Sequence, residues 1–181
     1  MTDYDVRDLV NDLGNINWGG NSFDVRLINN LNVEKLGEGS HRSVFKHRDV
    51  DSHVIKVAKE GTIWANEREN EISNEGTIYD GKTQVPKEII DRTAVVSSYD
   101  RSAGGPRWLL MEKLDTRNVY EHHGRALWRL MLDLGWGVED LRLENIGLLR
   151  QEPMLIDYTY LKPIDAMLPK PKERVKRGHR W

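Results

Sequence analysis

Asp140-Leu-Arg-Leu-Glu-Asn145 leads directly into Ile146-Gly-Leu-Leu-Arg-Gln-Glu-Pro-Met-Leu-Ile-Asp157, and this stretch decides how the chain is interpreted. Two short apolar runs, 146–149 and 154–156, flank a polar turn that contains Pro153, which predicts a β-hairpin. Asn145 immediately precedes the first strand, and Asp157 immediately follows the second. Antiparallel pairing therefore places both at the same end of the hairpin, with Asp140 in the loop that leads into it.

The three polar side chains at this rim allow two interpretations. Two carboxylates and an amide have the oxygen donors that Mg²⁺ takes in proteins. Alternatively, all three are ordinary turn residues: Asp140 caps a turn, Asn145 precedes a strand and Asp157 ends one. Asp and Asn are common in turns, which favours this second interpretation. The rest of the chain decides between the two.

Composition narrows the class of protein. A chain of 181 residues forms one domain, or two small lobes that share a cleft. Its 27 basic and 29 acidic residues give no general attraction to nucleic acid or membrane. The absence of cysteine excludes disulfides and thiolate metal sites. Because no apolar run reaches the length of a membrane span and no signal sequence is present, we expect a cytoplasmic protein, in the host cytoplasm if the chain is viral.

The first half of the chain predicts a sheet. Residues 1–30 are assigned to an N-terminal cap, with a helix that ends near Gly14. Three strand-like segments follow, and Gly37 and Gly39 fall at the tip of their first hairpin. Glycines there allow backbone N–H groups to approach a phosphate closely, although a plain turn uses the same residues.

Lys56 is a lysine inside an apolar strand, 53–58. Such a lysine either extends to solvent or meets a buried anion. Residues 63–78 predict a helix that carries several glutamates, and one of these, turned inward, would pair with Lys56. Residues 94–99 and 108–114 then predict a second hairpin, which completes a five-stranded antiparallel sheet with one helix. The polar stretch 115–118 is the expected lobe boundary, and 119–134 is predicted helical.

In this order the parts resemble the protein-kinase superfamily. Asp140 and Asn145 keep the spacing of the catalytic-loop motif His-Arg-Asp-Leu-x-x-x-x-Asn, and Val54-Ile55-Lys56 resembles Val-Ala-Ile-Lys. The run from Leu36 to Val44 resembles the glycine-rich loop, and Leu155-Ile-Asp157-Tyr resembles the strand that leads to Asp-Phe-Gly. The agreement in order and spacing covers about residues 31–160.

The resemblance implies an α+β, protein-kinase-like fold. It consists of an antiparallel five-stranded N-lobe sheet with one helix and a reduced, mostly helical C-lobe. The implied segments are an extension at 1–30, an N-lobe at 31–114, a C-lobe at 115–165 that holds the catalytic loop and the metal-binding hairpin, and a basic tail at 166–181.

The resemblance also implies ATP and Mg²⁺ as cofactors. Lys56 would bridge the phosphates of the nucleotide, held by a helix glutamate; spacing to Ile72 favours Glu69, with Glu67 and Glu71 as alternatives. Asn145 and Asp157 would bind Mg²⁺. The remaining implied site residues are the loop residues Gly37, Gly39 and Val44, the hinge Glu112 to Leu114 for adenine, Asp140 at the acceptor hydroxyl, and Arg142 where a cation is common.

Several positions depart from the kinase pattern. Arg42 stands where the third loop glycine would be, Val138-Glu139 replaces His-Arg, and Asp157 is followed by Tyr-Thr. Only 24 residues follow Asp157, and none of them resembles an activation segment. What remains is similar to reduced, atypical kinases of the RIO-like, phage and archaeal kinds.

Two functions follow as expectations. The first is a minimal phosphotransferase that passes the γ-phosphate of ATP to a protein hydroxyl, on Ser/Thr or on itself. The alternative is a weak or inactive pseudokinase that binds nucleotide or protein, encoded by a virus and acting on a host protein. The basic tail 170–181 favours a solvated terminus over contact with nucleic acid, although Trp181 is available for stacking.

Overall fold

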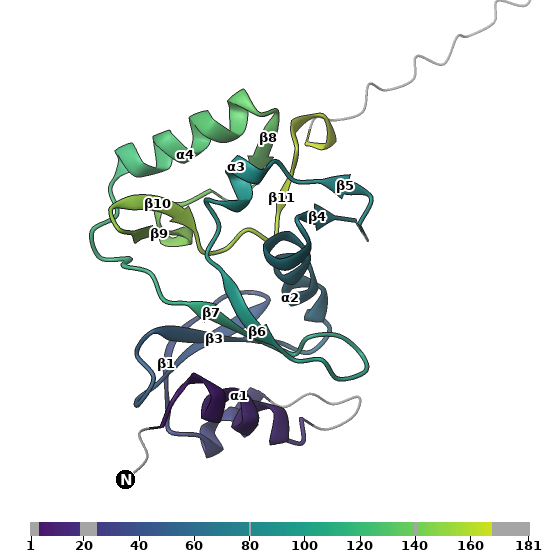
Figure 1. Cartoon of the computed structure of the whole chain (residues 1–181), viewed down its shortest axis with the longest axis vertical. Coiled ribbons are helices and arrows are strands. Elements are labelled where there is room, and N and C mark those ends of the chain that lie inside the picture. Colours follow the sequence, from purple (N-terminus) through teal and green to yellow (C-terminus); the bar gives the residue numbers. More distant parts are fainter. Residues whose placement is uncertain (1–3, 19–24, 80, 140, 168–181) are drawn as a thin grey trace, which may run out of the picture.

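The computed structural model describes residues 4–18, 25–79, 81–139 and 141–167. The predicted α+β class, with a five-stranded antiparallel sheet, is confirmed (Figure 1). The helices are α1 Val6–Asn15, α2 Ile63–Asn70, α3 Lys87–Ile90 and α4 Glu121–Asp133. The strands are β1 Val33–Glu38, β2 Arg42–His47, β3 His53–Ala58, β4 Thr77–Ile78, β5 Thr83–Gln84, β6 Val96–Tyr99, β7 Trp108–Glu112, β8 Trp136–Val138, β9 Ile146–Leu149, β10 Glu152–Leu155 and β11 Leu161–Pro163.

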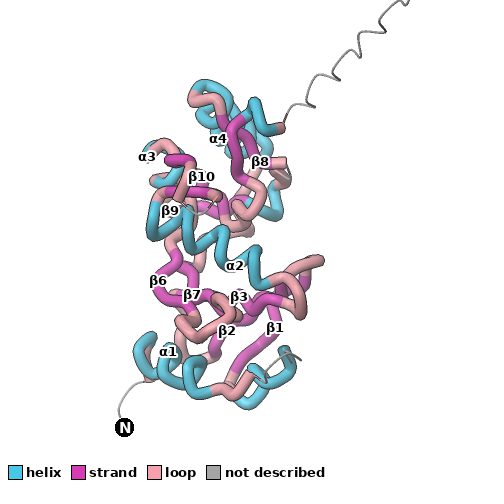
Figure 2. Tube along the Cα trace, turned by 90° about the vertical axis from the view of Figure 1, so that its right-hand side faces the viewer, coloured by secondary structure: helices cyan, strands magenta, loops and turns pink. Residues whose placement is uncertain are grey.

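The five-stranded sheet has the order β1-β2-β3-β7-β6, and every neighbouring pair is antiparallel. Val44 lies opposite Lys56, and Arg42 lies opposite Ala58. Since residues that pair directly across an antiparallel ladder share a face, Arg42, Val44 and Lys56 all lie on one face of the sheet. That face turns toward α2 and the rest of the molecule, as Figure 2 shows.

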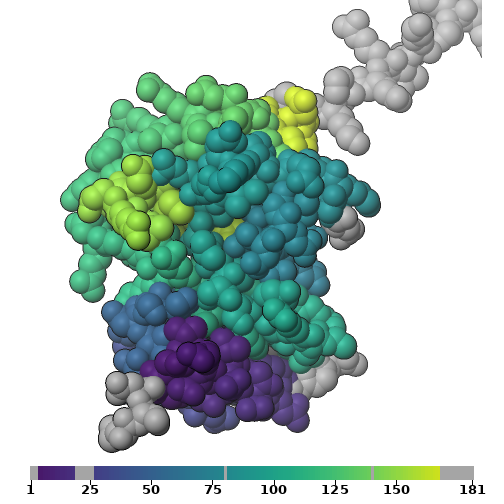
Figure 3. Space-filling model, viewed as in Figure 1, coloured from purple at the N-terminus to yellow at the C-terminus, as the bar shows by residue number. Residues whose placement is uncertain are grey.

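The other face of the sheet is covered by the N-terminal segment. Leu9 and Leu13 of α1 and Ile28 pack in one buried cluster with Ile55 and Leu110 of the sheet. This segment forms the purple layer along the bottom of the space-filling view in Figure 3. α1 runs to Asn15 and its cap is Ile16, so the predicted end at Gly14 falls one residue short.

The long helix predicted over 63–78 is wrong at its C-terminal end. After Asn70 the chain continues as a π-helical turn, Glu71–Glu75, and then stops at Gly76. Gly76 has a φ of 66°, a left-handed conformation that glycine adopts at little cost and that ends helices. Thr77 and Ile78 are therefore strand residues, and they pair with Thr83 and Gln84.

The part beyond β7 contains α4, the hairpin β9–β10 and the pair β8–β11. The hairpin has the predicted position, with Ile146 opposite Leu155 and Leu149 opposite Glu152. The expectation of a mostly helical C-lobe is wrong for residues 115–165, because two two-stranded sheets accompany the single long helix. β8 pairs with a strand more than twenty residues away, and short-range patterns do not reveal such a pairing.

A continuous core joins α4 and its hairpin to the inner face of the sheet. Buried side chains of this cluster come from both sides and include Ile72, Leu109, Met111, Leu127 and Leu155. The backbone amide of Ala94 donates to the carbonyl of Leu155, which ties the start of β6 to the hairpin. None of the helices in the described part of the chain has the length and apolar character to cross a membrane.

Candidate functional site

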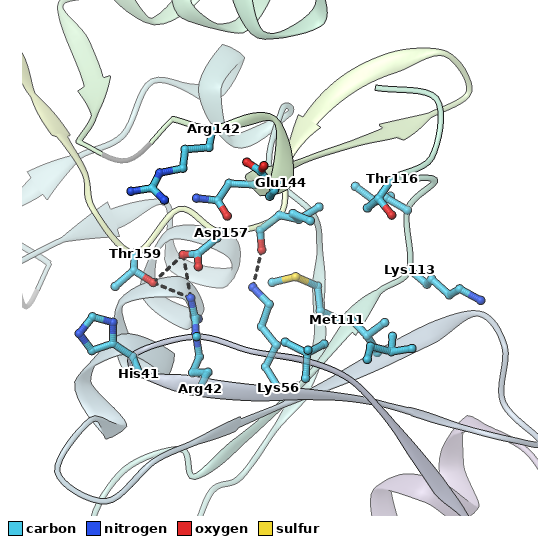
Figure 4. Close-up of a pocket in the computed structure, with 18 of the residues that line it drawn as sticks. His41, Arg42, Lys56, Met111, Lys113, Thr116, Arg142, Glu144, Asp157 and Thr159 are labelled. Carbon is cyan, nitrogen blue, oxygen red and sulfur yellow. Dashed lines mark hydrogen bonds and ion pairs between the residues drawn. The ribbon is translucent and has the colours of Figure 1, made fainter. Parts of the chain in front are cut away.

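A cleft of about 630 Å³ lies between the inner face of the sheet and the β9–β10 hairpin. Figure 4 shows Arg42 and Lys56 on the sheet side, with Arg142, Glu144 and Asp157 on the opposite wall. The cleft has the size of ordinary small-ligand sites. The predicted site residues that line it are Gly37, Gly39, Val44, Lys56, Glu112, Leu114, Arg142, Asn145 and Asp157.

Lys56 and Glu69 form a buried ion pair beneath the cleft. The Lys56 Nζ lies 2.9 Å and 3.2 Å from the two carboxylate oxygens of Glu69, and it also donates to the backbone carbonyl of Ile156. Lys56 is 6% exposed and Glu69 is fully buried. Of the candidate glutamates, Glu67 is exposed and Glu71 pairs with Arg68, so Glu69 is the one that contacts the lysine.

Arg42 is a second cation on the same carboxylate. Its Nη1 lies 2.7 Å from Glu69 Oε2, a charge contact that is not aligned as a hydrogen bond. Its Nη2 donates to Asp157 Oδ1 at 2.7 Å and to the hydroxyl of Thr159 at 2.9 Å. Arg42 is only 6% exposed, and it links β2 to the segment that follows β10. The contacts of Arg42 with Asp157 and Thr159 are drawn as dashed lines in Figure 4.

The backbone after Asp157 completes this charged cluster, which consists of Arg42, Lys56, Glu69 and Asp157. The amide of Tyr158 donates to Glu69 Oε1 at 3.2 Å, and the ring of Tyr158 is buried with its hydroxyl on the carbonyl of Ala94. Glu69 therefore accepts from a lysine and a backbone amide while it contacts a guanidinium. A buried carboxylate with this many partners is compensated for its loss of water.

The protonation of the cluster follows from these contacts. For Asp157, burial favours the neutral form, but Arg42 and then Lys56 outweigh it and lower the pKa of the carboxyl to about 2. For Arg42, burial opposes the charge, but Glu69 and Asp157 overcome it and raise the pKa. For Lys56, burial is the largest effect and lowers the pKa, while Glu69 acts against it. The carboxylate of Asp157 and the guanidinium of Arg42 are thus charged at neutral pH.

The metal site implied by the sequence resemblance was tested on these contacts. Asn145 and Asp157 line one wall of the cleft and have the oxygen donors that Mg²⁺ takes. However, Oδ1 of Asp157 already accepts from Arg42, with the Thr159 hydroxyl 3.2 Å away. Within the described residues, no group of three or more His, Cys, Asp or Glu side chains is arranged to hold a metal. In this arrangement a metal on Oδ1 of Asp157 would have to share that oxygen with Arg42, and the metal roles predicted for Asn145 and Asp157 stay predictions.

The opposite end of the cleft is apolar. Val44, Val54 and Met111 of the sheet contribute apolar side chains to the lining of the cleft, together with Leu114. The backbone at the predicted hinge is partly engaged, since the amide of Glu112 donates to Val95 and that of Lys113 donates to Ser52. The cleft therefore has an apolar end beside Leu114 and a charged end beside Asp157.

Two predicted elements of the site lie outside the described residues. These are Asp140, the expected residue at the acceptor hydroxyl, and the basic tail 170–181. Arg142 is exposed on the far wall of the cleft, next to Glu144 (Figure 4). The roles predicted for these residues stay predictions.

Sequence reasoning did not assign Arg42 or Thr159 to the site. In the sequence, Arg42 is a departure from the glycine pattern, although the alternation of side chains along a strand places it on the same face of β2 as Val44. A charged side chain on a face that packs inward has to meet an opposite charge, and this is the signal that points to Arg42. Thr159 carries no comparable signal, because its contacts depend on how the chain turns after Asp157.

No protein-family model matches the chain, and no curated protein matches it. Among solved structures it is similar to WbdD, described as a bifunctional kinase-methyltransferase (16% identity, TM-score 0.42, 68% of this chain and 30% of that one). It also matches monomeric WbdD (16%, TM-score 0.44, 82% and 52%) and WbdD with the kinase inhibitor LY294002 (17%, TM-score 0.45, 70% and 32%). The chain thus spans about a third to a half of these structures.

Proposed function

We propose that the cleft binds ATP and that the chain is a kinase-like phosphotransferase acting on a protein hydroxyl, of Ser/Thr or of the chain itself. The observation that carries this proposal is the buried Lys56–Glu69 ion pair at the charged end of a cleft whose other end is apolar. An apolar slot suits a purine base, and a fixed ammonium suits the phosphates attached to it. A cleft with one apolar and one charged end suits a ligand that is apolar at one end and anionic at the other.

Each end has a proposed role in binding and transfer. Leu114 and the apolar side chains near it hold the base, and Lys56, oriented by Glu69, holds the phosphates. Phosphoryl transfer depends mainly on positioning and on neutralising charge, so a rigidly held cation is the group that such a site needs. Asp140 is proposed to orient the acceptor hydroxyl. The sequence resemblance implies Mg²⁺ at Asn145 and Asp157, but Arg42 holds the carboxylate of Asp157 in this structure, so the proposed transfer does not depend on Mg²⁺.

Binding is tested by thermal unfolding with and without ATP. A ligand at 100 times its Kd stabilises the folded state by about 2.7 kcal/mol. We expect a rise in Tm for the wild type and a much smaller one for Lys56→Met. Lys46→Met is the matched control, because Lys46 lies on β2 and pairs with Glu34 at 3.1 Å, away from the cleft. No rise in Tm at saturating ATP would sink the proposal of a nucleotide site.

Transfer is tested separately with γ-labelled ATP. We expect label on the chain itself or on an added protein, and its loss in Asp140→Asn. Asp133→Asn, an exposed aspartate at the end of α4, should transfer as the wild type does. ATP binding without transfer to any protein, in the wild type, would contradict the phosphotransferase.

A second candidate is favoured by the Arg42–Asp157 contact. With its carboxylate held by a guanidinium, Asp157 does not have the arrangement of a metal-dependent enzyme, and the chain could bind ATP as a non-catalytic module that recognises a protein partner. This candidate predicts a normal rise in Tm with ATP together with no transfer. The two assays therefore separate the candidates.

A further inference from the structure

Arg42 is a buried cation whose partners are two carboxylates and a hydroxyl group. It sits on the inner face of β2, opposite Ala58, and lines the cleft although it is 6% exposed. Its guanidinium contacts Glu69 near the end of α2 and Asp157 after the hairpin. Its partners come from two separate parts of the chain, namely α2 and the segment that follows β10.

The charges in this cluster balance without an added ion. Arg42 and Lys56 contribute two positive charges, and Glu69 and Asp157 contribute two negative charges. The contact between Arg42 Nη2 and Asp157 Oδ1 is 2.7 Å, which is the length of a strong, charge-assisted hydrogen bond. Both groups are held in their charged forms by each other, as the pKa of about 2 for Asp157 also indicates.

A divalent metal on the same oxygen would be placed beside this guanidinium. Magnesium binds carboxylate oxygens at about 2.0–2.1 Å, so it and Nη2 would lie within about 5 Å of each other. Two cations at that separation repel strongly in a partly buried site. With a metal on Oδ1, Arg42 would have to give up this contact, and its buried guanidinium would keep only Glu69 and Thr159 as partners.

We propose that the guanidinium of Arg42 takes the place of a divalent metal ion beside Asp157. The cleft then binds ATP without a metal ion. This inference rests on the proposed nucleotide site. Arg42 acts through Asp157 and Glu69, so it is a positioning residue. It neutralises the carboxylate of Asp157 and holds it in place at the end of the cleft where the phosphates bind. A guanidinium suits this role because its planar fork contacts two carboxylates at once, which a lysine ammonium does not reproduce.

The test is the affinity for ATP measured by calorimetry in magnesium and in EDTA. For the wild type we expect the two Kd values to agree within about threefold. In Arg42→Gln, which frees Asp157, we expect the Kd in EDTA to be weakened by about tenfold or more, and magnesium to restore most of it. Arg48→Gln is the matched control, because Arg48 is exposed on the same segment and should bind as the wild type does in both buffers.

The outcomes separate this inference from the function on which it rests. A wild type that binds ATP in magnesium and loses about tenfold or more of its affinity in EDTA overturns the role of Arg42 and leaves the nucleotide site standing. Absence of binding in both buffers overturns both. The wild-type comparison needs no variant, so it decides the question even if Arg42→Gln does not fold. Mn²⁺ titrated without nucleotide gives a second readout: we expect tighter Mn²⁺ binding in Arg42→Gln than in the wild type, and equal binding contradicts the proposal.

Discussion

At Glu69, a single carboxylate meets the ammonium of Lys56, the guanidinium of Arg42 and the backbone amide of Tyr158. The two cations are almost fully buried, and Glu69 is the carboxylate that both of them contact. Glu69 is thus their shared counter-charge. Through this one side chain, residues 42 and 56 of the sheet are joined to the backbone of residue 158.

Replacing Glu69 by glutamine keeps the shape of the side chain and removes its charge. Two buried cations would then face a neutral amide, and breaking a buried ion pair in this way costs about 3–5 kcal/mol of stability. Urea unfolding measures the change. Glu67→Gln, an exposed glutamate of the same helix, is the control, and its effect should stay within about 0.5 kcal/mol. Similar stabilities for the two variants would contradict the shared role of Glu69.

Asp157 makes stability depend on pH in the acid range. Its folded-state pKa of about 2 is below the ordinary value of 3.8, so the folded state binds this proton less readily than the unfolded state does. The stabilisation is therefore fully present above the ordinary pKa and is lost as the pH falls toward 2. Its size is reduced by solvent screening, because the side chain is 42% exposed.

This pH dependence is measured as the difference in unfolding free energy between the wild type and Asp157→Asn. We expect the wild type to be the more stable near neutral pH, and the gap to narrow between about pH 5 and pH 2. Other titrating groups are common to both proteins and cancel in the difference. A gap that does not change with pH would show that Arg42 does not hold the carboxylate ionised.

The sequence predicts three of the four members of this cluster but not the fourth, Arg42. Lys56, Glu69 and Asp157 could be chosen because each lies at a definite spacing from an apolar run. Their contact with Arg42 could not, because it joins positions 115 residues apart and depends on how two hairpins face each other. Patterns along the chain identify the strand on which a charge lies, and the fold decides which charge it meets.

At the scale of elements, local patterns predict the contiguous pieces. The hairpin β9–β10 and the strands β3 and β7 follow from apolar runs and turns in the sequence. Two features did not follow. The predicted helix that begins at residue 63 extends past Gly76, where a left-handed glycine ends it, and the pairing of β8 with the distant β11 is not predicted. The first is a local signal in the sequence, whereas the second depends on tertiary packing.

The hairpin β9–β10 approaches the predicted hinge closely at Gly147. A Cβ placed on Gly147 would lie 2.6 Å from the Cβ of Leu114 and 3.2 Å from a methyl group of Ile156. We therefore expect Gly147→Ala to destabilise the fold by about 1–3 kcal/mol, as overpacking does. Urea unfolding tests this, with Gly14→Ala as the control, because nothing lies within 4 Å of a Cβ there and α1 should tolerate or gain from alanine. Equal stability of Gly147→Ala and the wild type would contradict the close packing of the hairpin against Leu114.

At the scale of the whole molecule, the sheet separates two buried clusters. On one face, Leu9 and Leu13 of α1 pack against Ile55 and Leu110; on the other, Leu109 and Met111 join the core around α4 and the hairpin. Alternation along β7 sends successive side chains to opposite faces, so one strand serves both clusters. The cleft opens on the second face only. The described part of the N-terminal segment, 4–18 and 25–30, therefore supports the sheet from the face opposite the cleft and does not line the cleft.

This arrangement predicts that stability and ligand binding can be separated by substitution. Leu13 is fully buried behind the sheet, and Leu13→Ala should lower the unfolding free energy by about 2–5 kcal/mol. Because its cluster lies on the face away from Lys56, the rise in Tm caused by saturating ATP should match that of the wild type. Leu132→Ala, a half-exposed leucine of α4, is the control and should change stability much less. If Leu13→Ala kept its fold but lost the response to ATP, the sheet would be transmitting strain from one face to the other, and the N-terminal segment would have to be counted as part of the site.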